Sequence, residues 1–284
     1  MPLNKACEGK SYSPVTTDVT REAIEKYARA YNDDNPAFFD PKRPGGIVAP
    51  PLFGVVVTWL SLLQAISDPE LQADLLRLLH GEQDMEFFNP IRPGDKIVSS
   101  AKILSIETKP TGETVTIELE ASDQNREPKL RALFIAFIRG GGSGKGAASD
   151  QTAPDVERGP AMLAVSQQVD ADQTVRYAEA SGDHNPIHVD ANVARMAGLR
   201  GIIVHGLCTM AFTSKVMIDN LCGGDPTRLK RLRVRFVRPV FPGQTITTKV
   251  WREGDKNGRE IYAYETYNPE GRAVIRGGIA EVAV

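Results

Sequence analysis

Apolar residues recur at helical spacing in two short segments of the chain and dominate two longer ones. Residues 20–31 and 170–180 each predict an amphipathic helix, with Thr20 and Asp170 as the expected N-caps. An Asn-Pro loop follows each short helix, because proline disfavours helical structure in the residue before it. Two longer, apolar helices are expected after these loops, at residues 52–66 and 207–221.

Alternating apolar and polar residues then predict a group of strands after each long helix. The first group is expected at residues 96–106, 114–122 and 132–138, and the second at 232–237, 245–251, 260–267 and 273–282. A helix followed by a run of antiparallel strands predicts an α+β fold. In this fold the sheet wraps around the apolar helix.

The two sets of elements also share sequence. YAEASGDHNPIHVD at residues 177–190 corresponds to YARAYNDDNPAFFD at residues 27–40, and FVRPVFPGQTI at residues 236–246 corresponds to FFNPIRPGDKI at residues 87–97. Self-similarity at a nearly constant separation indicates tandem units. We therefore expect a duplicated fold in one chain.

A glycine- and serine-rich segment at residues 140–150 marks the expected linker between the copies. It does not fit a phosphate-binding loop, because Arg139 and Gly146 stand where that motif requires glycine and then serine or threonine. The predicted domains are residues 1–139 and 151–284.

Composition narrows the class of protein. The 284 residues carry a formal net charge of −2, which gives no reason to expect nucleic-acid binding. No apolar run approaches 18 residues, so we expect no membrane span. The three cysteines are too few and too scattered for a disulfide framework, and a cytoplasmic location fits best.

The best candidates for chemistry lie in the second copy. A turn at Asn185-Pro186 would bring the Asp183 carboxylate beside the His188 imidazole, which makes a general acid/base pair. Asp183 and Asn185 alternatively cap turns, while His188 packs in the core. The amide of Gly206, at the expected start of the apolar helix, would be a donor to a developing oxyanion.

The first copy lacks the reactive groups. Phe38 stands in place of His188, and Pro51, which has no amide hydrogen, stands in place of Gly206. The Asp, Asn and Pro residues common to both copies are explained by the loop alone. We therefore expect one acid/base site per chain, in the second copy.

The segment SGDHNPIH at residues 181–188 resembles the signature of the MaoC-like, type 2 (R)-specific enoyl-CoA hydratases, which also have a His-Gly start to the central helix. Both copies resemble the hot-dog unit of that family. The resemblance implies a tandem (double) hot-dog fold, with residues 1–139 as the non-catalytic domain and residues 151–284 as the catalytic domain.

The resemblance further implies that Asp183 and His188 are the catalytic pair and that Asn185 supports their geometry. Gly206 would donate its amide to the thioester carbonyl, with His205 next to it at the substrate. Water would add across a trans-2-enoyl thioester, or leave from an (R)-3-hydroxyacyl thioester. The substrate would be carried by CoA or an acyl-carrier protein, with no cofactor and no metal.

A basic strand face is a second candidate for substrate binding. Arg233 and Arg235 share one face of an expected strand, whereas the corresponding positions of the first copy are Asp84 and Glu86. Either arginine could contact CoA phosphates, or both could be solvated surface residues. A zinc site formed by the histidines 184, 188 and 205 is disfavoured, because they lack ordered spacing and cysteine partners.

Two other functions remain as alternatives. One is an acyl-CoA thioesterase on the same fold, and the other is a non-catalytic subunit that binds acyl thioesters. A homodimer of the two-domain chain is an expected assembly.

Overall fold

The computed structural model describes residues 2–75, 77–140 and 158–284. Apart from Gly140, the predicted linker at 140–150 lies outside the described residues, and the proposed domain boundaries stay a prediction. We call residues 1–139 the N-terminal half and residues 151–284 the C-terminal half.

The N-terminal half runs through η1 (Lys5–Cys7), β1 (Val15–Asp18), α1 (Arg21–Arg29), η2 (Pro36–Phe38), η3 (Pro51–Phe53), α2 (Gly54–Ile66), η4 (Pro69–Leu71), β2 (Leu78–Phe87), β3 (Lys96–Lys109), β4 (Gly112–Ser122) and β5 (Pro128–Arg139). The C-terminal half runs through β6 (Leu163–Gln168), α3 (Gln173–Ser181), η5 (Pro186–His188), α4 (Ala191–Met196), α5 (Gly206–Leu221), η6 (Pro226–Arg228), β7 (Leu229–Phe236), β8 (Thr245–Lys256), β9 (Arg259–Tyr267) and β10 (Ala273–Ala283).

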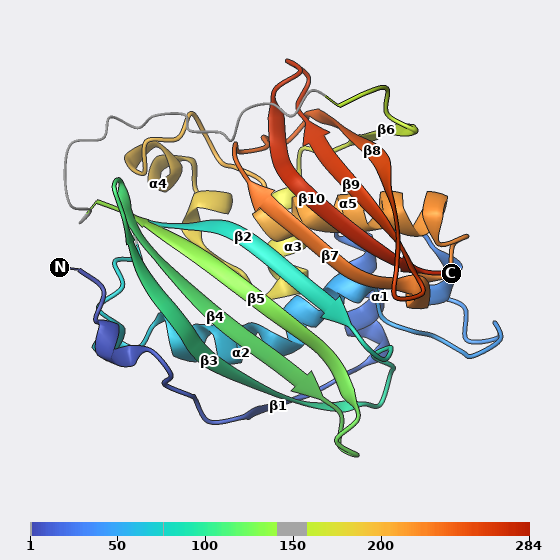
Figure 1. Cartoon of the computed structure of the whole chain (residues 1–284), viewed down its shortest axis with the longest axis horizontal. Coiled ribbons are helices and arrows are strands. Elements are labelled where there is room, and N and C mark those ends of the chain that lie inside the picture. Colours follow the sequence, from blue (N-terminus) through green and yellow to red (C-terminus); the bar gives the residue numbers. More distant parts are fainter. Residues whose placement is uncertain (1, 76, 141–157) are drawn as a thin grey trace.

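All of these strands form one antiparallel sheet of ten strands, in the order β1-β3-β4-β5-β2-β7-β10-β9-β8-β6. The order reads the same from both ends once each strand is replaced by its counterpart in the other half. The two halves are therefore related by a two-fold pseudosymmetry axis between β2 and β7. The sheet curves around helices α1, α2, α3 and α5, which lie behind it in Figure 1. This arrangement confirms the predicted α+β, double hot-dog architecture.

Strands β2 and β7 join the halves through oppositely charged side chains. Asp84 lies opposite Arg233 in the register, and Glu82 lies opposite Arg235. Arg231 donates two hydrogen bonds to the Asp84 carboxylate, at 2.8 and 2.6 Å, and Arg233 donates one to Glu82 at 2.9 Å. Charge-assisted, two-pronged contacts of this kind fix geometry well.

On the concave side, α2 packs against β3 and β4, and α5 packs against β7. Helices α1 and α3 meet at the pseudosymmetry axis, where the buried rings of Tyr27 and Tyr177 lie 5.6 Å apart and their hydroxyls 3.1 Å apart. These two tyrosines occupy the same place in the sequence repeat. The repeat thus places matching residues against each other in the core.

The predicted helices are present, with one capping error. The Thr20 side chain accepts a hydrogen bond from the Ala23 amide at 3.1 Å, so it is the N-cap of α1 as expected. Asp170 is not the N-cap of α3, because α3 begins at Gln173 after Asp172. The Asp170 carboxylate instead pairs with Arg176 at 2.6 Å.

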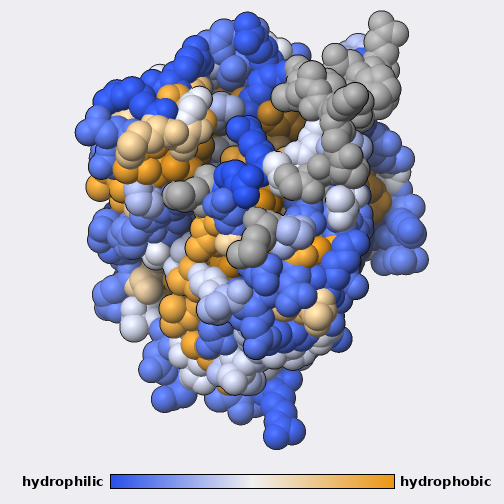
Figure 2. Space-filling view, turned by 90° about the vertical axis from the view of Figure 1, so that its left-hand side faces the viewer, coloured by the Kyte–Doolittle hydropathy of each residue, from blue (hydrophilic) through white to orange (hydrophobic). Residues whose placement is uncertain are grey.

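The described helices include none with the length and apolarity needed to cross a membrane. On the face shown in Figure 2, apolar residues form several separate patches among polar ones. This mixture is ordinary for a protein surface.

Candidate active site

The loop between α3 and η5 is built by its own polar side chains. Gly182 ends α3 in the left-handed conformation, with φ of 83°. The Asp183 carboxylate then accepts a hydrogen bond from the Asn185 amide at 3.1 Å, and the Asn185 side chain accepts one from the Ile187 amide at 3.3 Å. Pro186 opens the short 3₁₀ turn, as its fixed φ favours. The turn places the His188 side chain in the interior of the protein.

The N-terminal half builds the same loop. Asp33 accepts from the Asn35 amide at 3.0 Å, and Asn35 accepts from the Ala37 amide at 2.9 Å. Phe38, fully buried, occupies the position of His188. The shared Asp and Asn residues therefore build the loop in both halves, whereas only the C-terminal half has an imidazole at this position.

His188 is oriented by a backbone carbonyl. Its Nδ1 donates to the Ile203 carbonyl at 2.8 Å, which leaves Nε2 free to accept a proton. The side chain is buried, and burial lowers the pKa of the imidazole; the charge of Asp183 opposes this effect. A neutral ring with a free Nε2 is the form that can act as a general base.

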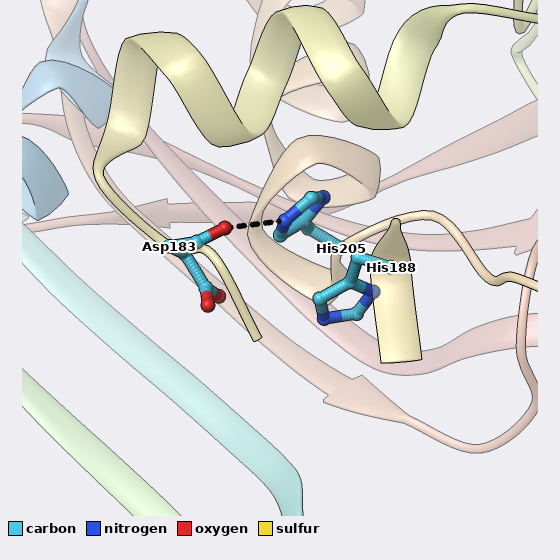
Figure 3. A group of neighbouring side chains, drawn as sticks. All are labelled: Asp183, His188 and His205. Atoms are coloured by element: carbon cyan, nitrogen blue, oxygen red, sulfur yellow. Dashed lines mark hydrogen bonds between the residues drawn. The ribbon is translucent and has the colours of Figure 1, made fainter. Parts of the chain in front are cut away.

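His205 lies directly against His188 and also holds the loop. Its Nε2 donates to the backbone carbonyl of Asp183 at 3.0 Å, and its ring stacks on that of His188 with centroids 3.8 Å apart (Figure 3). Burial, with a smaller contribution from His188, lowers the pKa of His205 to about 3. This ring is therefore neutral at physiological pH. Its buried Nδ1 has no hydrogen-bond partner among the described residues.

The structure brings Asp183, His188 and His205 into one cluster, with a potential ligand atom of each within 4.8 Å of the others. In Figure 3 the Asp183 carboxylate and the His188 ring extend to the same side of the His205 ring. A carboxylate and an imidazole so close can share the proton transfers of one reaction. The same atoms would be the ones available to a metal ion. His184, a member of the disfavoured zinc set, lies outside this cluster with an exposed side chain near Glu179.

Gly206 is the first residue of α5, so its amide has no acceptor within the helix. A Cβ atom added here would lie 3.2 Å from the Phe236 ring, which leaves no room for a side chain without movement. The preceding residue, His205, has φ and ψ of −55° and 136°. Its counterpart Pro50 has −52° and 142°, so the backbone is nearly the same in both halves. The halves differ at the next residue, where Pro51 offers no amide hydrogen.

The equivalent site in the N-terminal half is occupied by an ion-pair network. The Lys215 ammonium of α5 lies 3.3 Å from the buried carboxylate of Asp33, and 3.1 Å from each of Asp34 and Asp219. Burial raises the pKa of Asp33, and the charge of Lys215 opposes that rise. In the C-terminal half, the neighbour from α2 is an indole ring without a charge, since Trp59 packs 3.3 Å from the Cβ position of Gly182.

The structure does not place Arg233 and Arg235 with the histidine cluster. Leu232 and Val234 of the same strand are buried, and strand alternation sends the two arginines to the opposite face of the sheet. There Arg233 bonds to Glu82, and Arg235 lies 3.9 Å from the same carboxylate.

Two family models match the sequence, one in each half. Residues 155–273 match the MaoC like domain, and residues 6–129 match the FAS1-like, dehydratase domain region. A protein of Dictyostelium discoideum named probable enoyl-CoA hydratase 2 is 30% identical over 273 residues, which covers 94% of this chain and 92% of that protein.

Solved structures agree with the architecture. A MaoC-like dehydratase from Phytophthora capsici superposes with a TM-score of 0.83 at 25% identity, covering 100% of this chain and 98% of the other. A Mycobacterium tuberculosis protein described as a double hotdog fold gives a TM-score of 0.64 at 12% identity, with 97% and 96% covered. The chain therefore belongs to the MaoC-like, type 2 enoyl-CoA hydratase family, in its double hot-dog form.

Proposed function

We propose that the protein is a hydro-lyase that adds water to trans-2-enoyl thioesters and removes it from (R)-3-hydroxyacyl thioesters. The observation that carries the proposal is the pairing of the half-buried Asp183 with the buried His188, close to the N-terminus of α5. The other half of the chain keeps the same loop but lacks both the imidazole and the glycine amide. The relatives named enoyl-CoA hydratase and dehydratase support this reaction class.

In the proposed mechanism, the thioester carbonyl accepts a hydrogen bond from the Gly206 amide. Water lies between Asp183 and His188, its oxygen bonds to C3, and the electrons of the C2–C3 double bond move toward the carbonyl as an enolate. A proton is then delivered to C2, and the two side chains share the removal of one proton and the supply of the other. The helix N-terminus contributes most when the carbonyl oxygen carries this negative charge.

Asn185 and His205 hold the reacting groups in place. Asn185 closes the turn that carries His188, and His205 fixes the Asp183 backbone while its ring packs on His188. His205 also lies directly before Gly206, so it borders the position proposed for the thioester. Neither residue needs to exchange a proton for this role.

The reaction is tested with crotonyl-CoA by following the loss of enoyl absorbance and the release of free thiol in parallel. Hydration predicts a loss of absorbance without free thiol, and chiral analysis of the product should give the (R)-alcohol. Release of thiol would instead support the thioesterase alternative. Binding of crotonyl-CoA without either signal would support a non-catalytic subunit.

The pH dependence follows from the environment of His188. Because burial lowers the pKa of this imidazole below its ordinary 6.5, the ring stays neutral at pH 7 and gains a proton only under more acidic conditions. We expect kcat/KM for hydration to fall on the acidic side with a midpoint below pH 6.5. An acidic limb centred above pH 6.5 would contradict a neutral His188 in the active form.

We propose the CoA phosphates as a second contact of Arg233 and Arg235, whose guanidinium groups remain partly exposed beside Glu82. In the double variant Arg233→Gln/Arg235→Gln, the KM for crotonyl-CoA should rise several-fold. The KM for a crotonyl thioester of N-acetylcysteamine, which lacks phosphates, should stay the same. An unchanged KM for the CoA substrate would show that the two arginines pair with Glu82 and do not contact the CoA phosphates.

Acyl-CoA or an acyl-carrier protein is the proposed carrier of the substrate, in a cytoplasmic location. A homodimer of the chain is the proposed assembly. Sedimentation equilibrium tests the assembly, and cell fractionation tests the location.

A further inference from the structure

An aromatic cluster connects the N-terminal half to the candidate oxyanion donor. The His80 ring of β2 lies 4.2 Å from the Phe134 ring of β5 and 5.0 Å from the Phe236 ring of β7, measured between centroids. Phe236 in turn packs against Gly206, at 3.2 Å from its Cβ position. Three rings in contact thus extend from β5 to the first residue of α5.

The pseudosymmetry relates this cluster to an equivalent position in the other half of the molecule. The residue equivalent to Phe236 is Phe87, and the residue equivalent to His80 is Leu229, each 149 positions away. Both Phe87 and Leu229 line a small pocket, of about 40 Å³, beside Pro51. The two-fold relation therefore places His80 and Phe236 at the corresponding position beside Gly206.

His80 is the polar member of this cluster of three rings. Its Nε2 lies 3.1 Å from the side-chain oxygen of Gln83, a buried residue, so the ring is held in one orientation. Burial lowers the pKa of His80 to about 4, and the ring is neutral at physiological pH. A neutral ring fixed by one hydrogen bond and packed on two aromatic neighbours is a rigid support.

We propose that His80 is a positioning residue for the active site, supplied by the half that lacks the catalytic groups. This role rests on the proposed function: His80 holds the Phe236 ring against Gly206. The position of Phe236 sets the space in which the thioester carbonyl meets the Gly206 amide. His80 acts through Phe236, and it takes no part in proton transfer.

The test replaces His80 by the residue that its counterpart has. His80→Leu should lower kcat for crotonyl-CoA hydration roughly tenfold, because small displacements of a donor cost rate steeply. His80→Phe keeps a ring against Phe236 and should recover most of the loss. The matched control is Leu229→Ala, which disturbs the equivalent site in the other half and should change the melting temperature without lowering kcat.

Amide hydrogen exchange of the peptide covering residues 206–212 gives a readout that needs no activity. His80→Leu should speed exchange at the start of α5, whereas Leu229→Ala should not. A kcat within twofold of the unaltered protein, or equal exchange in both variants, would overturn the inference. If the unaltered protein fails to hydrate crotonyl-CoA, the proposed function fails, and the exchange comparison still decides the role of His80.

Discussion

Substituting proline for Gly206 should abolish most of the hydration activity and leave the fold intact. The first position of a helix tolerates proline well, and Pro51 occupies the equivalent position in the N-terminal half. The change removes the amide hydrogen that we propose as the oxyanion donor. Loss of one such donor lowers kcat by roughly 100- to 1,000-fold. Steady-state kinetics on crotonyl-CoA, together with a melting curve, measures both effects.

The matched control is Gly206→Ala. Alanine keeps the amide hydrogen but adds a Cβ that must displace the Phe236 ring, as the proline ring also must. The difference in kcat between the two variants therefore isolates the hydrogen bond from the steric effect. Equal losses in both would show that crowding at Phe236, and not the amide, explains the result.

Conversion of His188 to phenylalanine should have an effect at least as large. Phe38 shows that the same loop accommodates a fully buried phenyl ring at this position, so we expect the variant to fold. It loses the imidazole that we propose for proton transfer, and general acid–base catalysis is typically worth roughly 100- to 10,000-fold in rate. Asp183→Asn should reduce kcat over a similar range. The measurement is again hydration of crotonyl-CoA, with circular dichroism to verify folding.

The reciprocal change, Phe38→His, is the informative control. It should not create a second active site, because Pro51 still lacks an amide hydrogen and Lys215 still pairs with Asp33. Activity of Phe38→His combined with His188→Phe should therefore remain near that of His188→Phe alone. Recovered turnover would mean that the imidazole suffices and that the other differences between the halves are irrelevant.

Much of this architecture could be predicted from the sequence because the chain repeats itself. The shared Asp and Asn residues were expected to build the loop, and both copies use them in the same hydrogen bonds. The proximity of Asp183 and His188 also follows from the turn at Pro186. Local chemistry of this kind is visible in sequence because its partners lie within five residues of one another.

Features that depend on contacts with distant parts of the chain could not be predicted from the sequence. Strand β2 was missed, because it carries polar side chains on both faces, and its carboxylates pair with arginines of β7 and β5. Asp170 looked like an N-cap but bonds to Arg176, which also reaches the Arg29 carbonyl of α1. The contact of His80 with Phe236 crosses the halves in the same way. In each of these three cases, a residue distant in the sequence determines the structure.

The charged pairs between β2 and β7 also determine which halves can join. The register places Asp84 opposite Arg233 and Glu82 opposite Arg235. If two N-terminal halves paired through the same strand, the pseudosymmetry would set Asp84 against a second Asp84, and two C-terminal halves would set Arg233 against a second Arg233. Like charges directly opposite each other destabilise a strand pair. The charges along this seam therefore favour pairing of an N-terminal half with a C-terminal half over pairing of either half with a copy of itself.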